Sequence, residues 1–269
     1  MKKLIIQGIK FDKKSSYQKG PKLAPPLIRE ALNCGSSNMY TENLISIENS
    51  WIDDKGDFEI SEYFDIERLT KTHLNLGAKV FTLGGDHSVT FPIIKAYNEK
   101  YPKLDILHID AHSDLYDQFE GDKYSHASPF ARIMENGFAV KLVQVGIRTL
   151  NTHLAEQADK FNVEIHHMKD LDLSKIPKFK NPLYISLDMD AFDPAYAPGV
   201  SHHEPGGLTS RQVINLIQSI DTEIIGADIV EYNPNRDFQN MTAFLAAKMM
   251  KEAHSPHPSW QIRGRPARR

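Results

Sequence analysis

Three short stretches of the sequence place aspartate and histidine directly after apolar runs. They read LGGDHS at residues 83–88, DAHSD at residues 110–114 and SLDMDAFDP at residues 186–194. Carboxylates and imidazoles are common protein ligands of divalent metal ions, and they also transfer protons in hydrolytic reactions. Three such stretches in similar positions are best explained together, as parts of one chemical site.

The spacing within two of these stretches lets their side chains share one face. In an extended segment, residues two apart point the same way and are separated by roughly 6 to 7 Å. Asp110, His112 and Asp114 can therefore face one side of a strand end. Asp188 and Asp190 can do the same at the end of another strand.

Four aspartates that share a small volume require cations. If the strand ends are neighbours, each pair of carboxylates about 4 Å apart costs on the order of 4 kcal/mol at an effective dielectric of about 20. Two divalent ions balance four carboxylates, and His87 with His112 adds nitrogen ligands without sulfur. This ligand set favours manganese and also accommodates iron, cobalt, nickel or zinc. Two adjacent ions can bridge one water, lower its pKa and present hydroxide at neutral pH.

Each stretch alone has a simpler explanation. A single aspartate at a strand end is usually a helix cap or a turn residue. A single histidine is usually a hydrogen-bonded loop or core residue, and Gly84-Gly85 alone indicates only a turn. The combination of all three at strand ends favours a metal site.

Six short apolar segments must position these residues. They span residues 3–9, 79–85, 104–110, 141–148, 182–190 and 223–232. Most are hydrophobic along nearly their whole length, which is typical of strands covered on both faces. In a sheet of such strands, ligands bind at the carboxyl ends, where the acidic stretches lie.

Helical patterns lie between the apolar segments. Thr209 and Gln212 have the spacing of a capping box before a helix that runs to about residue 220. A second pattern in residues 61–80 stops at Gly77 and places four side chains on one stripe, Ile66, Leu69, His73 and Leu76. A third, over residues 90–102, has a proline near each end. Strands alternating with helices predict an α/β fold of three layers, α/β/α, around a mostly parallel sheet.

The chain has 269 residues, of which 41% are hydrophobic and 25% are charged. This length suffices for one large core or two modest ones. No linker or repeat divides the sequence, so we expect one catalytic domain over residues 1–253. Residues 254–269 are rich in proline, histidine and arginine, and we expect a disordered tail in which His254 and His257 have no function.

The net charge of −3 gives no reason to expect nucleic acid or an anionic membrane as a partner. Cys34 is the only cysteine, so no disulfide and no cysteine-rich zinc site can form within the chain. No run of roughly 18 apolar residues indicates a membrane span. We therefore expect a cytoplasmic protein whose function depends on a local site.

In their order along the chain, GGDHS, DAHSD and SLDMDAFDP resemble the three signatures of the ureohydrolase family, which comprises arginases, agmatinases and related guanidino-group hydrolases. The resemblance extends from KGPKLAPPLIREAL to AAKMMKE and so covers most of the chain. It implies an α/β three-layer fold, two manganese ions per subunit and a small guanidino substrate. It also implies a homo-oligomer, a trimer or a hexamer.

The resemblance further implies a metal ligand set and a supporting pair. Six side chains would bind the ions: Asp110 and Asp188 as bridges, His87 and Asp114 on one ion, and His112 and Asp190 on the other. Ser186 and Asp193 belong to the third signature, and we expect them to orient ligands or the turn.

Three residues receive catalytic roles from the resemblance. ADIVEYNP is similar to the family segment whose glutamate holds the guanidinium, which nominates Glu231, and YSHASPF nominates His126 as a proton relay at the entrance. Asp114 would accept the proton of the attacking hydroxide and deliver it to the leaving amine. The simpler alternatives are a surface ion pair for Glu231 and an ordinary loop histidine for His126.

The substrate is predicted from departures within the family. Arginases carry an aspartate after the GIR strand, where this chain has Thr149, and two further stretches look more like agmatinases. We therefore expect agmatine to be hydrolysed to urea and putrescine. Guanidinobutyrate, L-arginine and formiminoglutamate are alternatives, as are a deacetylase with one metal ion and a metal-binding protein without activity. Residues 201–203 contact the distal end of the substrate or merely shape a loop.

Overall fold

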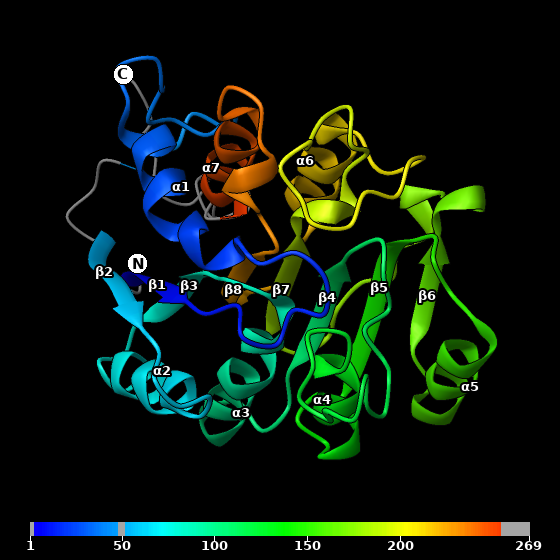
Figure 1. The fold of residues 1–269 in the computed structure, drawn as a ribbon. Helices are drawn as coiled ribbons and strands as arrows, with labels where there is room; N and C mark the ends of the chain where they lie inside the picture. The colour runs from blue at the N-terminus through cyan, green and yellow to red at the C-terminus, as the bar shows by residue number, and fades with distance from the viewer. Residues whose placement is uncertain (1–2, 48–51, 254–269) are drawn as a thin grey trace, which may run out of the picture.

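One parallel sheet runs through the computed structural model, which describes residues 3–47 and 52–253 (Figure 1). Within these residues the sheet has eight strands in the order β2-β1-β3-β8-β7-β4-β5-β6, and each neighbouring pair is parallel. The strands are β1 (Leu4–Lys10), β2 (Ile52–Glu59), β3 (Lys79–Leu83), β4 (Asp105–Ile109), β5 (Lys141–Ile147), β6 (Glu164–His167), β7 (Leu183–Asp188) and β8 (Ile224–Val230).

Helices cover both faces of this sheet. They are α1 (Ala24–Asn33), α2 (Asp65–Asn75), α3 (Thr90–Lys100), α4 (Pro129–Glu135), α5 (Thr152–Phe161), α6 (Ser210–Ser219) and α7 (Met241–Ala253). In Figure 1, α2 to α5 lie below the sheet, and α1, α6 and α7 lie above it. The predicted three-layer α/β/α fold with a mostly parallel sheet is thus confirmed.

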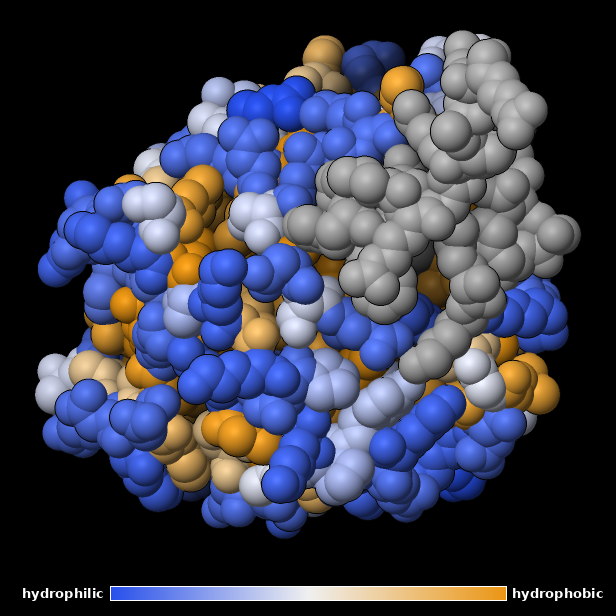
Figure 2. Space-filling model, turned by 180° about the vertical axis from the view of Figure 1, so that it is seen from behind, coloured by the Kyte–Doolittle hydropathy of each residue, from blue (hydrophilic) through white to orange (hydrophobic). Residues whose placement is uncertain are grey.

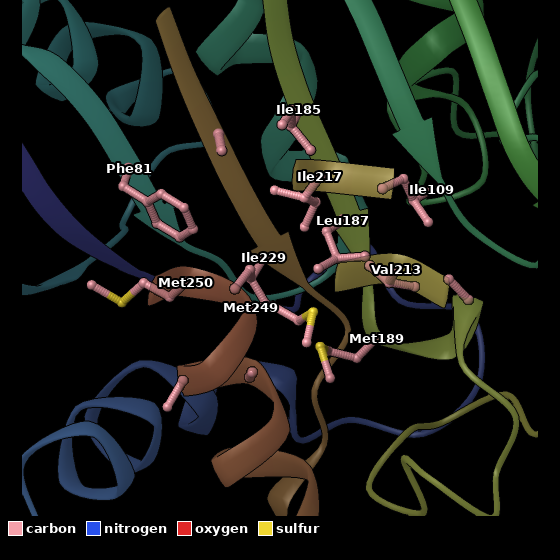
Figure 3. Close-up of a cluster of buried hydrophobic side chains, with 14 of the residues drawn as sticks. Phe81, Ile109, Ile185, Leu187, Met189, Val213, Ile217, Ile229, Met249 and Met250 are labelled. Atoms are coloured by element: carbon pink, nitrogen blue, oxygen red, sulfur yellow. The ribbon is translucent and has the colours of Figure 1, made fainter. Parts of the chain in front are cut away.

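Apolar side chains fill the space on each side of the sheet. On one side, residues of β3, β4, β7 and β8 pack against α1, α6 and α7. Figure 3 shows the part of this cluster that α6 and α7 contribute. Successive residues of β4 enter opposite layers, since Ile106 belongs to one cluster and Leu107 to the other. Burial on both faces explains why the strand sequences are hydrophobic throughout rather than alternating.

The chain order brings the acidic stretches together. After β3 the chain continues to β4 three strand positions away, and β8 and β7 later fill the two places between them. Four strands, β3, β8, β7 and β4, are therefore neighbours in the sheet. Because they are parallel, the residues that follow them lie together at the carboxyl end of the sheet.

Several elements differ from the sequence prediction. All six predicted strands form, but β2 and β6 lie at the two sheet edges and were not predicted. Their sequences, IDDKGDFE and EIHH, are polar because each is only partly buried. The stripe predicted for α2 is wrong at Leu76, which lies beyond the helix end and is 60% exposed. Gly77 follows with φ +77°, the left-handed conformation that ends a helix.

The face in Figure 2 is mostly hydrophilic, with apolar residues in small patches among polar ones. Among the described helices, none has the length and apolar character needed to cross a membrane. The single catalytic domain expected over residues 1–253 stays a prediction, and the expected tail at 254–269 lies outside the described residues.

The predicted capping box of α6 is present and can be tested by its stability. Thr209 Oγ1 accepts a hydrogen bond from Gln212 N at 3.1 Å, and Gln212 Oε1 accepts one from Thr209 N at 2.9 Å. We expect Thr209→Ala to lower the free energy of unfolding by about 1 kcal/mol in urea denaturation. Thr209→Ser retains the oxygen and is the control. An alanine variant as stable as the wild type would contradict this role of the cap.

Candidate metal centre

After β3 the chain turns at Gly84 and Gly85, and this turn places His87 at the carboxyl end of the sheet. A Cβ atom on Gly85 would lie 1.7 Å from the carbonyl oxygen of Phe11, so only glycine fits this close approach. Asp86 then caps a 3-10 turn, His87–Val89, by accepting a hydrogen bond from Ser88 N at 3.1 Å. The glycine pair therefore forms the turn that its sequence indicates, and this turn positions His87.

His87 faces three of the four predicted carboxylates. Its Nδ1 atom lies 3.1 Å from Asp110 Oδ2, 3.1 Å from Asp114 Oδ2 and 3.0 Å from Asp188 Oδ2. The imidazole is fully buried. Nδ1 is nevertheless not placed to form a regular hydrogen bond with any of these oxygens. A nitrogen and three oxygens thus converge on one small space.

A hydrogen-bond chain behind His87 fixes which ring nitrogen carries the proton. His87 Nε2 lies 3.0 Å from Ser186 Oγ, and Ser186 Oγ donates to Asp228 Oδ1 at 2.7 Å. Because the serine proton is used by Asp228, Ser186 accepts from Nε2–H of the histidine. The lone pair of Nδ1 then points at the carboxylates, as in a metal ligand. Ser186 therefore orients His87, as the sequence predicted.

A second group lies beside the first. His112 Nδ1 is 3.1 Å from Asp190 Oδ2 and 3.5 Å from Asp110 Oδ1. These three residues offer ligand atoms within 4.8 Å of one another. Asp188 Oδ1 joins the groups by accepting a hydrogen bond from Asp190 N at 2.7 Å. All six residues predicted as metal ligands therefore lie together at the carboxyl end of the sheet.

The arrangement fits divalent cations. Asp110, Asp114, Asp188 and Asp190 are all less than 7% exposed, and unpaired buried charges are costly. Burial raises the pKa of Asp188 well above its usual value, and Asp190 and Asp110 add to this effect. Burial opposes the charged form of His87, but the adjacent carboxylates outweigh it and hold the pKa of the imidazole well above its usual value. Positive charge among these carboxylates, from a proton or a bound cation, therefore stabilises the cluster.

His108 supports the cluster and was not predicted from the sequence. Its Nε2 donates to Asp110 Oδ2 at 2.6 Å, while Gln144 Nε2 donates to its Nδ1 at 3.0 Å. The ring stacks on Phe130 with centroids 3.8 Å apart. His108 can form a ligand group with His87 and Asp110. Because both of its nitrogens are already occupied, we assign it the positioning of Asp110.

Arg148 is a second supporting residue that sequence reasoning missed. Its Nη2 donates to the carbonyl oxygen of Asp190 at 2.7 Å and to that of Glu204 at 2.7 Å. The guanidinium thereby links the loop that carries Asp190 to the loop that carries Glu204. Thr149, the next residue, donates its hydroxyl to the carbonyl oxygen of Ala111 at 3.1 Å. Asp193 orders the same region by accepting from the backbone nitrogens of residues 195, 206 and 207.

Glu231 lies next to the cluster and is firmly held. It is 4% exposed, and its Oε1 accepts a hydrogen bond from His87 N at 2.8 Å. Its backbone has φ +61°, and that of Asp114 has φ +48°. This left-handed conformation is uncommon outside glycine and is often found at functional sites. The alternative of a surface ion pair for Glu231 is wrong.

His126 lies between Glu231 and the N-terminal loop. Its Nδ1 is 3.6 Å from Glu231 Oε1, and its Nε2 is 2.8 Å from Ser16 Oγ. Burial lowers the pKa of this imidazole, but Glu231 outweighs burial and raises it to about 9. The ring stacks on His202, with centroids 5.5 Å apart. Ser16 lies far from the signatures in sequence, which is why no pattern indicated its contact.

Comparisons with known proteins agree with this arrangement. The sequence model of the Arginase family matches residues 2–255. An arginase named as mitochondrial, from Medicago truncatula, is 43% identical over 92% of this chain and 80% of its own length. A solved arginase structure from Medicago truncatula superposes with a TM-score of 0.90 at 41% identity, covering 94% of this chain and 86% of that one. The agmatine ureohydrolase of Thermoplasma volcanium gives a TM-score of 0.83 at 31% identity, covering 94% and 88%.

The chain behind His87 provides a test of the metal site. Ser186→Ala removes the acceptor for Nε2–H, so the ring is no longer held with Nδ1 toward the carboxylates. We expect the affinity for manganese, measured by calorimetric titration of the metal-stripped protein, to fall about 10- to 100-fold.

Thr90→Val is the matched control, because it removes the 2.9 Å hydrogen bond from Thr90 Oγ1 to Asp228 and leaves Ser186 in place. An equal loss in both variants would assign the effect to Asp228. Unchanged affinity in Ser186→Ala would contradict the role of Ser186.

Proposed function

Since this chain belongs to the arginase family, we propose that it hydrolyses the guanidino group of a small molecule to urea and an amine. The observation that carries the proposal is the buried carboxylate of Glu231 beside the cluster of four aspartates. A planar cation that pairs with Glu231 would have its central carbon near His87 and the aspartates. The two parts needed for hydrolysis, a cation acceptor and a metal cluster, are thus adjacent.

We propose that six side chains hold two manganese ions, His87, Asp110, His112, Asp114, Asp188 and Asp190. Carboxylates with imidazole and without sulfur favour manganese over softer ions. When bound, such a pair of ions lowers the pKa of a water molecule and stabilises developing negative charge. The rest of the chemistry depends on groups of the chain itself.

Glu231 would bind and orient the substrate. Its Oε1 already accepts from His87 N, and the remaining lone pairs of the carboxylate can accept N–H groups of a guanidinium. The backbone hydrogen bond from Glu231 N to the Gly85 oxygen, at 2.8 Å, holds the residue against the end of β3. Orientation by fixed groups of this kind lowers the barrier by avoiding the entropy of alignment.

Asp114 and His126 would move the protons. Asp114 Oδ2 lies 3.1 Å from His87 Nδ1, and we propose that it accepts the proton of the attacking water and passes it to the leaving nitrogen. His126 would exchange protons with solvent through Nε2, which contacts the hydroxyl of the exposed Ser16. The carbon–nitrogen bond to the amine then breaks, and the products are urea and a protonated amine.

L-Arginine is our first candidate substrate. The support is the extent of similarity to the Medicago arginase, which includes 92% of this chain. Thr149 and two stretches that look more like agmatinases favoured agmatine over arginine in the sequence.

Agmatine is the second candidate, as predicted from the sequence. Thr149 directs its hydroxyl to the backbone of Ala111 and brings no negative charge. The similarity to an agmatine ureohydrolase of known structure adds support.

Four further expectations stand as proposals. They are a homo-oligomer, a trimer or a hexamer as the family resemblance implies, the absence of nucleic acid as a partner, one catalytic domain over residues 1–253, and a cytoplasmic location. The single cysteine supports the last of these, whereas the Medicago relative is named as a mitochondrial protein.

Urea release by the manganese-loaded protein tests the proposed reaction. We expect metal-dependent urea from L-arginine or agmatine. In Glu231→Gln we expect kcat/KM to fall by about 100-fold, because loss of a buried charged partner costs roughly 2 to 5 kcal/mol. The glutamine oxygen can still accept from His87 N, so the metal content should not change.

Glu99→Gln is the control, because Glu99 is an exposed carboxylate of α3 that pairs with Lys71. A Glu231→Gln enzyme with two ions and wild-type kcat/KM would refute the role of Glu231. Two bound ions without urea from any guanidino compound would refute the proposed reaction.

A further inference from the structure

A pocket of about 360 Å³ opens beside the metal cluster. His112 lines it and also belongs to the cluster, because its Nδ1 lies 3.1 Å from Asp190 Oδ2. His202 forms part of the same wall and stacks on His126. These two histidines thus join the pocket to the metal cluster and to His126.

Two side chains of opposite charge line the outer part of this pocket, Glu204 and Arg236. Both are exposed. Within residues 3–47 and 52–253, neither side chain forms a hydrogen bond or an ion pair. A lone guanidinium and a lone carboxylate in one pocket can each receive a charged group of a ligand.

The backbones that carry these two residues are fixed. Arg148 donates to the carbonyl oxygen of Glu204 through Nε at 2.9 Å and Nη2 at 2.7 Å. Arg236 N donates to the carbonyl oxygen of Asn233 at 3.0 Å. Asn233 is fully buried, and its Nδ2 donates to Ser201 Oγ at 2.9 Å. The charged side chains thus extend from ordered loops.

Arg236 and Glu231 belong to the same loop. Both lie in the single segment after β8, with Glu231 buried at its start and Arg236 at the pocket. The Asn233 contacts stand between them and tie the segment to residues 19 and 201. One segment therefore presents an anion next to the metal cluster and a cation toward the mouth.

We propose that Arg236 binds the carboxylate, and Glu204 the ammonium, at the end of the substrate remote from its guanidino group. This inference rests on the proposed function and assigns its substrate class, guanidino α-amino acids. L-Arginine carries both groups, guanidinobutyrate only the carboxylate and agmatine only the ammonium. Agmatine would leave Arg236 without a partner and place a second cation near it.

The test compares ratios of kcat/KM, which cancel any general effect on folding or metal content. For Arg236→Gln we expect the ratio of L-arginine to agmatine to fall about 10- to 100-fold, mainly through KM. For Glu204→Gln we expect the ratio of L-arginine to guanidinobutyrate to fall by about 10-fold. Arg236→Lys keeps the charge and should retain most of the first ratio.

The control is Arg68→Gln on α2, which removes an exposed arginine that pairs with Asp65. It should leave both ratios unchanged. If Arg236→Gln lowers kcat/KM for all three compounds equally, or leaves the ratio at its wild-type value, the proposal for Arg236 is wrong. If agmatine is the preferred compound of the wild type and Glu204→Gln alone impairs it, the substrate class is an amine.

A binding measurement separates this inference from the proposed reaction. Calorimetry of manganese-loaded protein should detect L-ornithine, and the affinity should fall about 10-fold or more in Arg236→Gln, with putrescine as the comparison that lacks a carboxylate. A wild type that releases no urea would refute the reaction, yet ornithine binding would still decide the role of Arg236. Equal ornithine affinity in wild type and Arg236→Gln would overturn it.

Discussion

Four aspartate carboxylates share one buried space, and the rest of the structure depends on making that arrangement tolerable. Such a cluster is unfavourable in a low-dielectric interior unless positive charge enters it. The partners visible in the described residues are imidazoles, which either bear protons or act as metal ligands. The same feature that makes the site costly without cations therefore gives it affinity for them.

The fold supplies this cluster through the order of its strands. Insertion of β7 and β8 between β3 and β4 places three acidic stretches and Glu231 at adjacent strand ends. Buried side chains hold two of the proposed metal ligands in position. Ser186 and Asp228 lie behind His87, and Gln144 and His108 lie behind Asp110. Arg148 donates hydrogen bonds to the carbonyl oxygens of Asp190 in the cluster and of Glu204 at the pocket, and so links the two. If the proposed function holds, recognition of both ends of the substrate depends on the same backbone contacts.

The sequence predicted the parts that obey local rules. The usual place of ligands in parallel sheets correctly put Asp110 and its neighbours at the carboxyl end of the sheet. The extended geometry expected from their spacing is wrong, because residues 110–114 follow β4 in an irregular loop, Asp114 has φ +48°, and Asp190 lies in the 3-10 helix Met189–Ala191. His108 was not predicted because a histidine within an apolar strand looks like any core residue. Arg236 was not predicted because nothing in the sequence shows that it lines the same pocket as Glu204. The edge strand β2 escaped prediction since its polar sequence reflects partial exposure.

The most direct test of the account is diffraction from a manganese-loaded crystal, with data collected at the manganese absorption edge. We predict two anomalous peaks per chain at the carboxyl ends of β3, β4 and β7, with Asp110 and Asp188 contacting both. A single peak, or peaks away from these strand ends, would contradict the claim that the four aspartates form a centre for two metal ions.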